Sequence, residues 1–514
     1  MGRKTEIKGN ASCDAFHIIK RSYEMRKYTG MRSIACLAIC GVLMTSVVSL
    51  EAATLMVQKT NQKHNIATAK GSYANWDGIS DSTQFLDNQG NVCIAYNTKS
   101  NIVIVKTKNG KPVKRTITLK KKTSVFGGVT CDSDGNFYIV TGKTNETNNT
   151  ETKTIFVSKY DANGKLLASV GANGSSSLAY YYGDSFYTQT PFDGGNCDIA
   201  VNGDYVAVNY ARKMYSGHQS NSLFLVNRKT MQKESVECYY NSHSFAQRVV
   251  PWGEGFLLAS EGDCYDRAFT VSELKMPGTG DGISDDLINN TDFPDDWEII
   301  YDNTYSDEAS KTWTCDSQNI FSFWISKGAF DRYDMYEVND NFARMGGIAT
   351  GDVHNAAMVA ISAPSLSSKA KKENQQLFIQ IFDPNADLTT ANGYITSGTR
   401  SGLSGKNGDE NVTDYGVKWL TNYDKTYTIE NPQVVATDAG NYVILFERYK
   451  KYSYQCLYAI VVDANGNVVQ KTKKLASSAY LNPSRMPVYS QGKVWWAGNK
   501  TKGTAICIYS YAVK

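Results

Sequence analysis

Hydrophobic and polar positions alternate over short runs along most of the chain, and each run ends at a turn. The commonest unit is a turn with Gly or Asn followed by an apolar run rich in β-branched and aromatic residues, as in DSDGNFYIVTG around Gly135. Alternation bounded by such turn residues predicts β-strands. The apolar spacing of an amphipathic helix is not found after residue 53. The pattern therefore predicts an all-β chain.

The turn-and-strand unit recurs along the sequence. It is found around Gly90, Gly135, Gly203, Gly255, Asn319, Gly440 and Gly492. The interval from Asn319 to Gly440 is 121 residues, about twice the others, and so predicts one further unit, for which residues 354–364 are the candidate. The spacing favours eight units, with seven as the alternative.

A second turn follows within each unit, such as DANG at 161–164 and at 463–466. Asn-Gly turns between alternating runs are a strong hairpin signal, so each unit predicts about four antiparallel strands. Repeated four-stranded sheets without helices are typical of a β-propeller, in which neighbouring blades bury each other's faces and ring closure removes free edges. The last unit has three clear strands, and we expect residues 54–59 (TLMVQK) to supply its fourth. A pair of β-sandwiches is the alternative fold.

The first 53 residues predict a signal peptide. Five Lys and Arg residues between positions 20 and 32 precede an uncharged apolar run at 34–50, which Glu-Ala-Ala follows. A positive, then apolar, then small-residue order is typical of secretory signals. We expect residues 54–514 to form one mature domain that is secreted or held at the cell surface. Met25 and Met31 are alternative starts, and an uncleaved N-terminal anchor is the alternative to cleavage.

Composition and charge limit the classes of partner that we expect for this chain. The chain has 514 residues, with 54 Lys and Arg and 50 Asp and Glu. The leader holds eight of the basic and four of the acidic residues, which leaves 46 of each in the mature chain. A neutral chain gives no reason to expect a nucleic-acid partner. No second apolar run long enough to span a membrane follows the leader, and we expect a monomer.

Eight cysteines remain after the leader, and none has the spacing of a zinc site. Cys93, Cys456 and Cys507 lie inside apolar runs, where we expect buried free thiols that pack as small hydrophobic side chains. We expect at most one or two disulfides elsewhere.

Histidine is scarce, which makes its positions informative. His218, His243 and His354 each stand between a loop and a strand, in different units. If the innermost strands begin near them, the three side chains can converge on a central channel, where His can act as a base or proton donor. The densest polar stretch, residues 242–269, adds Arg248 and Arg267 as catalytic candidates. The ligand-binding candidates are Gln219, Gln247, Asp263 and Asp266. Local hydrogen bonds and Asp–Arg pairs that stabilise the fold are the alternative interpretation.

Three carboxylate-rich turns, at 132–136, 281–286 and 383–388, offer the clustered oxygens that calcium needs. The strongest candidate ligands are Asp281, Asp285 and Asp286. The first of the three turns, DSDGN, is also a plain hairpin turn. No motif requires a cofactor, so calcium is the one metal we consider.

The D-x-D-G-N type turns make the mature chain resemble extracellular bacterial β-propeller proteins. Regular WD dipeptides, a kelch Gly-Gly rhythm and a clean Asp-box are missing, so the resemblance implies architecture and compartment only. Secreted propellers include polysaccharide lyases and aryl sulfotransferases, which use channel His and Arg residues. No P-loop, G-x-S-x-G or H-E-x-x-H motif is present. We therefore expect a binding protein for a glycan, peptide or partner protein. The alternative is a propeller enzyme that acts on a carbohydrate or sulfate ester.

Overall fold

The structure is a computed structural model. It describes residues 51–55, 82–108, 111–112, 116–147, 149–174, 187–193, 195–214, 217, 219–236, 241, 243–262, 268–277, 312–322, 343–351, 355–364, 375–404, 411–451, 453–477, 479–500 and 506–513. The chain divides after Val48, and every described strand belongs to the unit from Ser49 to Lys514. Among these residues the one helical segment is the 3-10 turn η6 (Ala391–Gly393), which confirms the all-β prediction.

The strands form seven antiparallel sheets, which are the blades and are numbered in chain order. Blade 1 contains β2 (Ser82–Leu86), β3 (Val92–Asn97), β4 (Asn101–Lys108), β5 (Lys111–Pro112) and β6 (Ile117–Lys120). Blade 2 contains β7 (Val125–Cys131), β8 (Phe137–Gly142), β9 (Ile155–Tyr160) and β10 (Leu166–Ala172). Blade 3 contains β11 (Thr188–Pro191), β12 (Cys197–Asn202), β13 (Tyr205–Met214), β14 (Gln219–Asn227) and β15 (Gln232–Lys233).

The second half of the ring follows the same plan. Blade 4 contains β16 (Ser244–Trp252), β17 (Gly255–Gly262), β18 (Ala268–Lys275) and β19 (Thr314–Ser322). Blade 5 contains β20 (Ala343–Thr350), β21 (Ala356–Ser362), β22 (Gln376–Phe382) and β25 (Lys418–Trp419), with the inserted hairpin of β23 (Thr399–Ser404) and β24 (Asn411–Tyr415). Blade 6 contains β26 (Tyr427–Ala436), β27 (Tyr442–Lys450), β28 (Ser453–Val462) and β29 (Val468–Ala476). Blade 7 contains β30 (Ala479–Tyr480), β31 (Val488–Ser490), β32 (Lys493–Lys500), β33 (Ile506–Ala512) and β1 (Glu51–Leu55).

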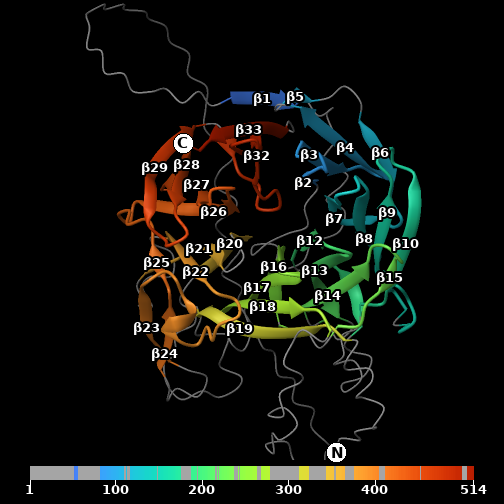
Figure 1. The fold of residues 1–514 in the computed structure, drawn as a ribbon, viewed down its shortest axis with the longest axis horizontal. Coiled ribbons are helices and arrows are strands. Elements are labelled where there is room, and N and C mark those ends of the chain that lie inside the picture. The colour runs from blue at the N-terminus through green and yellow to red at the C-terminus, as the bar shows by residue number, and fades with distance from the viewer. Residues whose placement is uncertain are drawn as a thin grey trace, which may run out of the picture. The chain divides into compact units, whose positions relative to one another are not determined.

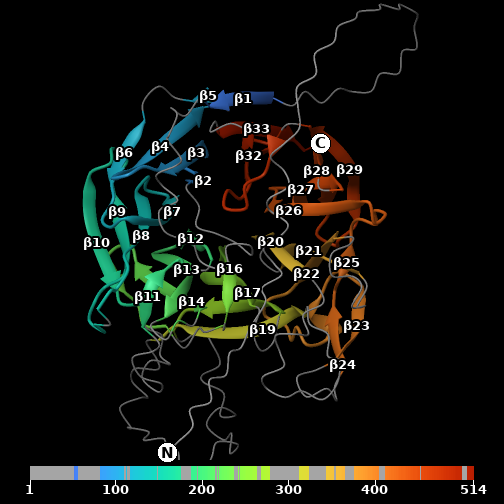
Figure 2. The same cartoon turned by 180° about the vertical axis from the view of Figure 1, so that it is seen from behind.

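The innermost strands touch in sequence around the ring, and the ring is closed. Contacts join β2 to β7, β7 to β12, β12 to β16, β16 to β20, β20 to β26 and β26 to β31, and β31 returns to β2. Figure 1 shows this order as a circle of sheets, and Figure 2 shows the same circle from behind. The chain is therefore a β-propeller of seven four-stranded blades. In blades 1, 3 and 7 one of the four strand positions is shared by two short strands, because β5 and β6 both pair with β4, β11 and β12 with β13, and β30 and β31 with β32.

The prediction of eight blades was wrong, and the alternative count of seven fits. The unit assigned to DSQNI around Asn319 contains no turn, because these residues lie within β19. That strand pairs with β18 as the outermost strand of blade 4. The unit predicted at 354–364 does correspond to a blade, since β21 is the second strand of blade 5. Units were counted by the apolar second strand of each blade. The outer strand β19 is apolar as well, so it was counted as a further unit.

The hydrophobic core lies between blades rather than within them. Each apolar cluster joins two neighbours, as expected for sheets that must bury both faces. Phe85 of blade 1 meets Phe137 of blade 2 edge to face, with ring centroids 6.2 Å apart. Phe321 of blade 4 stacks on Phe378 of blade 5 at 4.4 Å. Burial of each such ring stabilises the fold by up to about 3 kcal/mol, so blade order is held by apolar contacts.

The N-terminal strand completes the last blade, but at an earlier position than predicted. β1 pairs antiparallel with β33, and its five residues face Ile506–Ser510. The predicted strand at 54–59 shares only Thr54 and Leu55 with the observed one, and residues 56–59 lie outside the described part. Three of the five paired residues therefore belong to the segment predicted as leader.

The described cysteines behave as the sequence predicted. Cys93, Cys456 and Cys507 are buried free thiols in β3, β28 and β33. Cys131, Cys197 and Cys315 are free as well, while Cys238 and Cys264 lie outside the described residues. Burial raises the pKa of the Cys93 thiol well above its usual range, which keeps it protonated and unreactive.

Candidate functional site

One Asp-based turn recurs at the ends of the blades. In the turns that begin at Asp87, Asp132, Asp161 and Asp463, Oδ1 of the Asp accepts hydrogen bonds from the backbone N–H groups two and four residues later. A Gly with positive φ stands three residues after each Asp, at φ values between 72° and 91°. Gly adopts this conformation without steric cost. These turn bonds account for the D-x-x-G pattern that recurs in the sequence.

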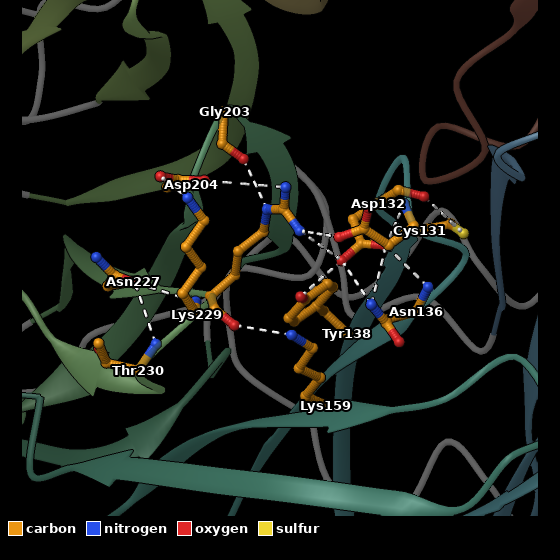
Figure 3. A network of polar contacts seen from close by, with 12 residues as sticks. Cys131, Asp132, Asn136, Tyr138, Lys159, Gly203, Asp204, Asn227, Lys229 and Thr230 are labelled. Atoms are coloured by element: carbon orange, nitrogen blue, oxygen red, sulfur yellow. Dashed lines mark hydrogen bonds and ion pairs between the residues drawn. The ribbon is translucent and has the colours of Figure 1, made fainter.

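The turn at Asp132, one of the three considered for calcium, is bound to the neighbouring blade instead (Figure 3). Its Oδ2 accepts from the Tyr138 hydroxyl at 2.8 Å and from Nη1 of Arg228 at 3.1 Å. Arg228 follows β14 in blade 3, and its Nη1 also lies 2.7 Å from Oδ2 of Asp134. Burial alone would raise the pKa of Asp132, but bonds from Asn136 and Tyr138 and the charge of Arg228 lower it. The guanidinium therefore supplies the positive charge that a cation would bring.

We expect Asp132→Ala to lower the free energy of unfolding by about 2 kcal/mol, because it removes the turn bonds, leaves Tyr138 without its acceptor and weakens the link between blades 2 and 3. Urea denaturation measures the loss. Asp161→Ala is the matched control, since Asp161 makes the same turn bonds without the Tyr and Arg partners, and its loss should be smaller. Equal losses would show that the inter-blade contacts of Asp132 add nothing.

Two predicted site residues lie on β16, the innermost strand of blade 4. Gln247 is fully buried, and its Nε2 donates to Oγ of Ser244 at 2.6 Å. Arg248 is buried too; its Nη1 donates to the backbone carbonyl of Gln247 at 2.8 Å and its Nη2 to that of Pro483 at 3.2 Å. Two of the Arg248 donors are thus on backbone oxygens, as in a structural contact.

The residues 481–487, which we call the central segment, contact four other blades of the ring. Besides the Arg248 contact with blade 4, Gln433 of blade 6 donates to the Asn482 carbonyl at 2.6 Å, and Nε of Arg485 donates to Ser82 of blade 1 at 2.7 Å. A Cβ placed on Gly347 of blade 5 would lie 3.2 Å from Sδ of Met486. Figure 1 shows the red segment beside β32 pointing into the ring. The segment therefore lies among residues of several blades, including the predicted site residue Arg248.

The remaining predicted residues are only partly described. Gln219 begins β14, and its carbonyl accepts from the backbone N–H of His243 at 2.9 Å, so these two candidates are neighbours. His243 has a φ of 49°, a conformation uncommon for a residue with a side chain. The predicted residues that lie outside the described part are His218, His354, Arg267, Asp263, Asp266, Asp281, Asp285 and Asp286.

Blade 6 carries an arginine surrounded by tyrosines, which we call the arginine–tyrosine cluster (Tyr423, Tyr427, Arg448 and Tyr458). The Arg448 guanidinium carbon lies 5.1, 4.7 and 4.6 Å from the ring centroids of Tyr423, Tyr427 and Tyr458. Tyr423, Tyr427 and Arg448 are half-buried, and exposed Lys450 lies 5.5 Å from the Tyr427 centroid. The Nε of Arg448 has no hydrogen-bond partner in the described part of the chain. The cluster thus presents aromatic faces and cations together at the surface.

The opposite side of β27 carries a buried carboxyl group. Glu447 Oε1 accepts from the Leu481 backbone N–H at 2.5 Å, and Oε2 accepts from the Tyr449 hydroxyl at 2.7 Å and from Asn431 Nδ2 at 3.1 Å. Asn431 sits in a β-bulge with a φ of 50°, and bulges often aim side chains at functional sites. Burial raises the pKa of Glu447 to about 7, and the nearby Glu430 contributes to this rise.

The sequence interpretation missed both groups on blade 6. Their signal is short-range: NYDKTY at 422–427 and ERYKKYSY at 447–454 place Tyr next to Lys or Arg repeatedly. The emphasis on His drew attention to other units. Within the described residues no group of three or more His, Cys, Asp and Glu side chains is placed to hold a metal ion. Nor does any helix in the described part have the length and apolar character to cross a membrane.

Comparison with known proteins identifies no family for this chain. No family model and no curated protein matches the chain. Among solved structures, the WD40 domain of Toxoplasma gondii coronin is 8% identical, with a TM-score of 0.40, and the match covers 91% of this chain and 87% of that one. The α-L-arabinanase of Cellvibrio cellulosa is 10% identical, with a TM-score of 0.28 and coverage of 67% and 93%. A subtype N11 neuraminidase-like protein from A/flat-faced bat/Peru/033/2010 is 9% identical, with a TM-score of 0.34 and coverage of 87% and 93%.

Proposed function

We propose that this propeller is an exported binding protein and that it binds a glycan at the arginine–tyrosine cluster of blade 6. The observation that carries the proposal is the half-exposed set of Tyr423 and Tyr427 rings around Arg448. Tyrosine rings pack against the C–H faces of sugars, and their hydroxyl groups stay hydrated. The guanidinium and Lys450 add donors for sugar hydroxyl groups or anionic substituents. Export rests on the leader pattern in the sequence.

The hydrogen bonds of the predicted site residue Arg248 favour binding over catalysis. Two donors of Arg248 are on backbone carbonyls, one of which belongs to Pro483 of the central segment. An enzyme acting on a carbohydrate or sulfate ester stays the alternative, and Glu447 favours it, because a carboxyl with a pKa near 7 suits general acid catalysis. However, Glu447 is fully buried and accepts three hydrogen bonds from the protein, which supports a structural role.

Tyr427→Ala tests the binding proposal on a glycan array. We expect the exported chain to bind at least one class of glycan, and the variant to bind it about fivefold more weakly, since one aromatic face contributes about 1 kcal/mol. Tyr205→Ala is the matched control, because Tyr205 is also half-buried and packs edge to face on Trp313 at 4.7 Å, on blade 3. Absence of glycan binding by the parent, or equal losses in both variants, would contradict the proposal.

A further inference from the structure

Charge is distributed unevenly around the ring. Residues 415–514 contain thirteen Lys and Arg but only five Asp and Glu, whereas residues 54–414 contain 33 and 41. The two parts therefore carry formal charges of about +8 and −8 that cancel in the mature chain. The basic part comprises blades 6 and 7 together with β25, except for β1. The acidic excess of residues 54–414 lies outside the described part, because the described residues up to 414 hold 20 Lys and Arg and 17 Asp and Glu. The described residues from 415 onward hold eleven and five, so blades 6 and 7 are the more basic sector of the described ring.

The acidic groups of this sector offset only part of its basic charge. Asp424 and Asp438 are exposed, and bonds from Thr426 together with the charge of Lys450 lower the pKa of Asp424. Glu447 is fully buried, and burial raises the pKa of half-buried Glu430. Asp463 is engaged with backbone N–H groups of its turn. Among the described residues, no ion pair includes Lys450, Lys471 or Lys474. The exposed lysines therefore keep their charge available for a partner.

The basic surface is continuous with the arginine–tyrosine cluster. Lys474 on β29 is paired directly with Tyr458 on β28, and Thr472 of β29 lies within hydrogen-bonding reach of Tyr423. β29 is the outermost strand of blade 6, and its exposed lysines are Lys471 and Lys474. The same strand begins with Val468 and Val469, which are 43% and 57% exposed. Aromatic, apolar and cationic side chains thus follow one another across the sheet to its outer edge.

We infer that the ligand is a polyanionic glycan, one that carries carboxylate or sulfate groups, and that it runs from the arginine–tyrosine cluster over β29. This inference rests on the proposed function and names its ligand class. The tyrosine rings contact the sugar faces, while Arg448, Lys450, Lys471 and Lys474 bind the anionic groups. A polymer with regularly spaced charges can engage several of these cations at once, whereas a neutral sugar uses only the rings.

Binding to a matched series of polymers tests the inference. The probes are dextran sulfate, carboxymethyl dextran, uncharged dextran and polyglutamate, each titrated against the exported chain at rising salt. We expect the two charged dextrans to bind, with affinity that falls as salt rises. The double variant Lys471→Glu and Lys474→Glu should bind them about tenfold or more weakly. A second double variant, Lys120→Glu and Lys165→Glu, makes the same charge change on exposed residues of blades 1 and 2 and should stay within about twofold of the parent.

Three results would overturn the inference. Uncharged dextran that binds as tightly as the charged polymers would remove the anionic requirement and leave glycan binding standing. Polyglutamate that binds as tightly as the charged dextrans would show a general polyanion surface instead of a glycan site. Equal losses in the two double variants would place the site elsewhere. Failure of the proposed function itself is seen separately, as a parent chain that binds no glycan on the array.

Discussion

A chain that begins at residue 56 will unfold at a much lower urea concentration than one that begins at Ser49. The shorter chain lacks β1, so five residues of β33 lose their antiparallel partners and the last blade gains a free edge. At about 1 kcal/mol for each lost backbone hydrogen bond, we expect the free energy of unfolding to fall by about 4 kcal/mol. Urea denaturation of both chains, made without the leader, measures the difference.

A chain that begins at Thr54 is the informative intermediate. It keeps only two of the five paired residues, which is the state that cleavage after the predicted leader of residues 1–53 would produce. We expect its stability to lie between those of the other two chains. If all three unfold together, β1 does not close the ring. N-terminal sequencing of exported protein then shows whether the mature chain keeps Glu51–Ala53 and with them the complete strand.

The second large effect that we expect is a dependence of the free energy of unfolding on pH. Burial raises the pKa of Glu447 from an ordinary value of 4.5 to about 7, so between these values the folded state holds a proton that the unfolded state has lost. Stability contributed by the protonated group is therefore complete below pH 4.5 and is lost as pH rises through 7. We expect the free energy of unfolding to be lower at pH 8 than at pH 5, by about 3 kcal/mol from this group.

The variant Glu447→Gln tests whether Glu447 causes this fall of the free energy of unfolding with rising pH. The amide keeps an oxygen for the Leu481 N–H but cannot ionise, so the variant should lose most of the decline between pH 5 and pH 8. Asp438→Asn, an exposed change on the same blade, is the control and should retain it. Urea denaturation at several pH values provides the comparison. An unchanged slope in Glu447→Gln would contradict the assignment.

Local turn chemistry explains how far the sequence could predict the fold. Gly135 and Gly440 stand at tight turns that require positive φ, and these turns revealed the hairpins. Blade counting failed at Asn319, because a fully paired outer strand can be as apolar as an inner one. The first strand was predicted three residues late, because alternation alone does not fix register against Ile506. Register depends on a strand more than 450 residues away, which no local pattern reveals.

The candidate site was harder to predict for a related reason. Arg248 and Gln247 do lie on an innermost strand, as a polar pair beside a predicted strand suggested. The arginine–tyrosine cluster instead combines residues from β26, β27 and β28 with one that precedes them. Single tyrosines in strands are common and mostly pack in the core. Only the assembled sheet shows that three of them surround one guanidinium.

The central segment has a consequence for the order in which the ring assembles. Its residues, 481–487, come late in the sequence, and their partners include Ser82, Arg248 and Gln433 from three earlier blades. The segment can make all of these contacts only when the three earlier blades have already formed, so it docks late in folding. Such long sequence separation slows folding.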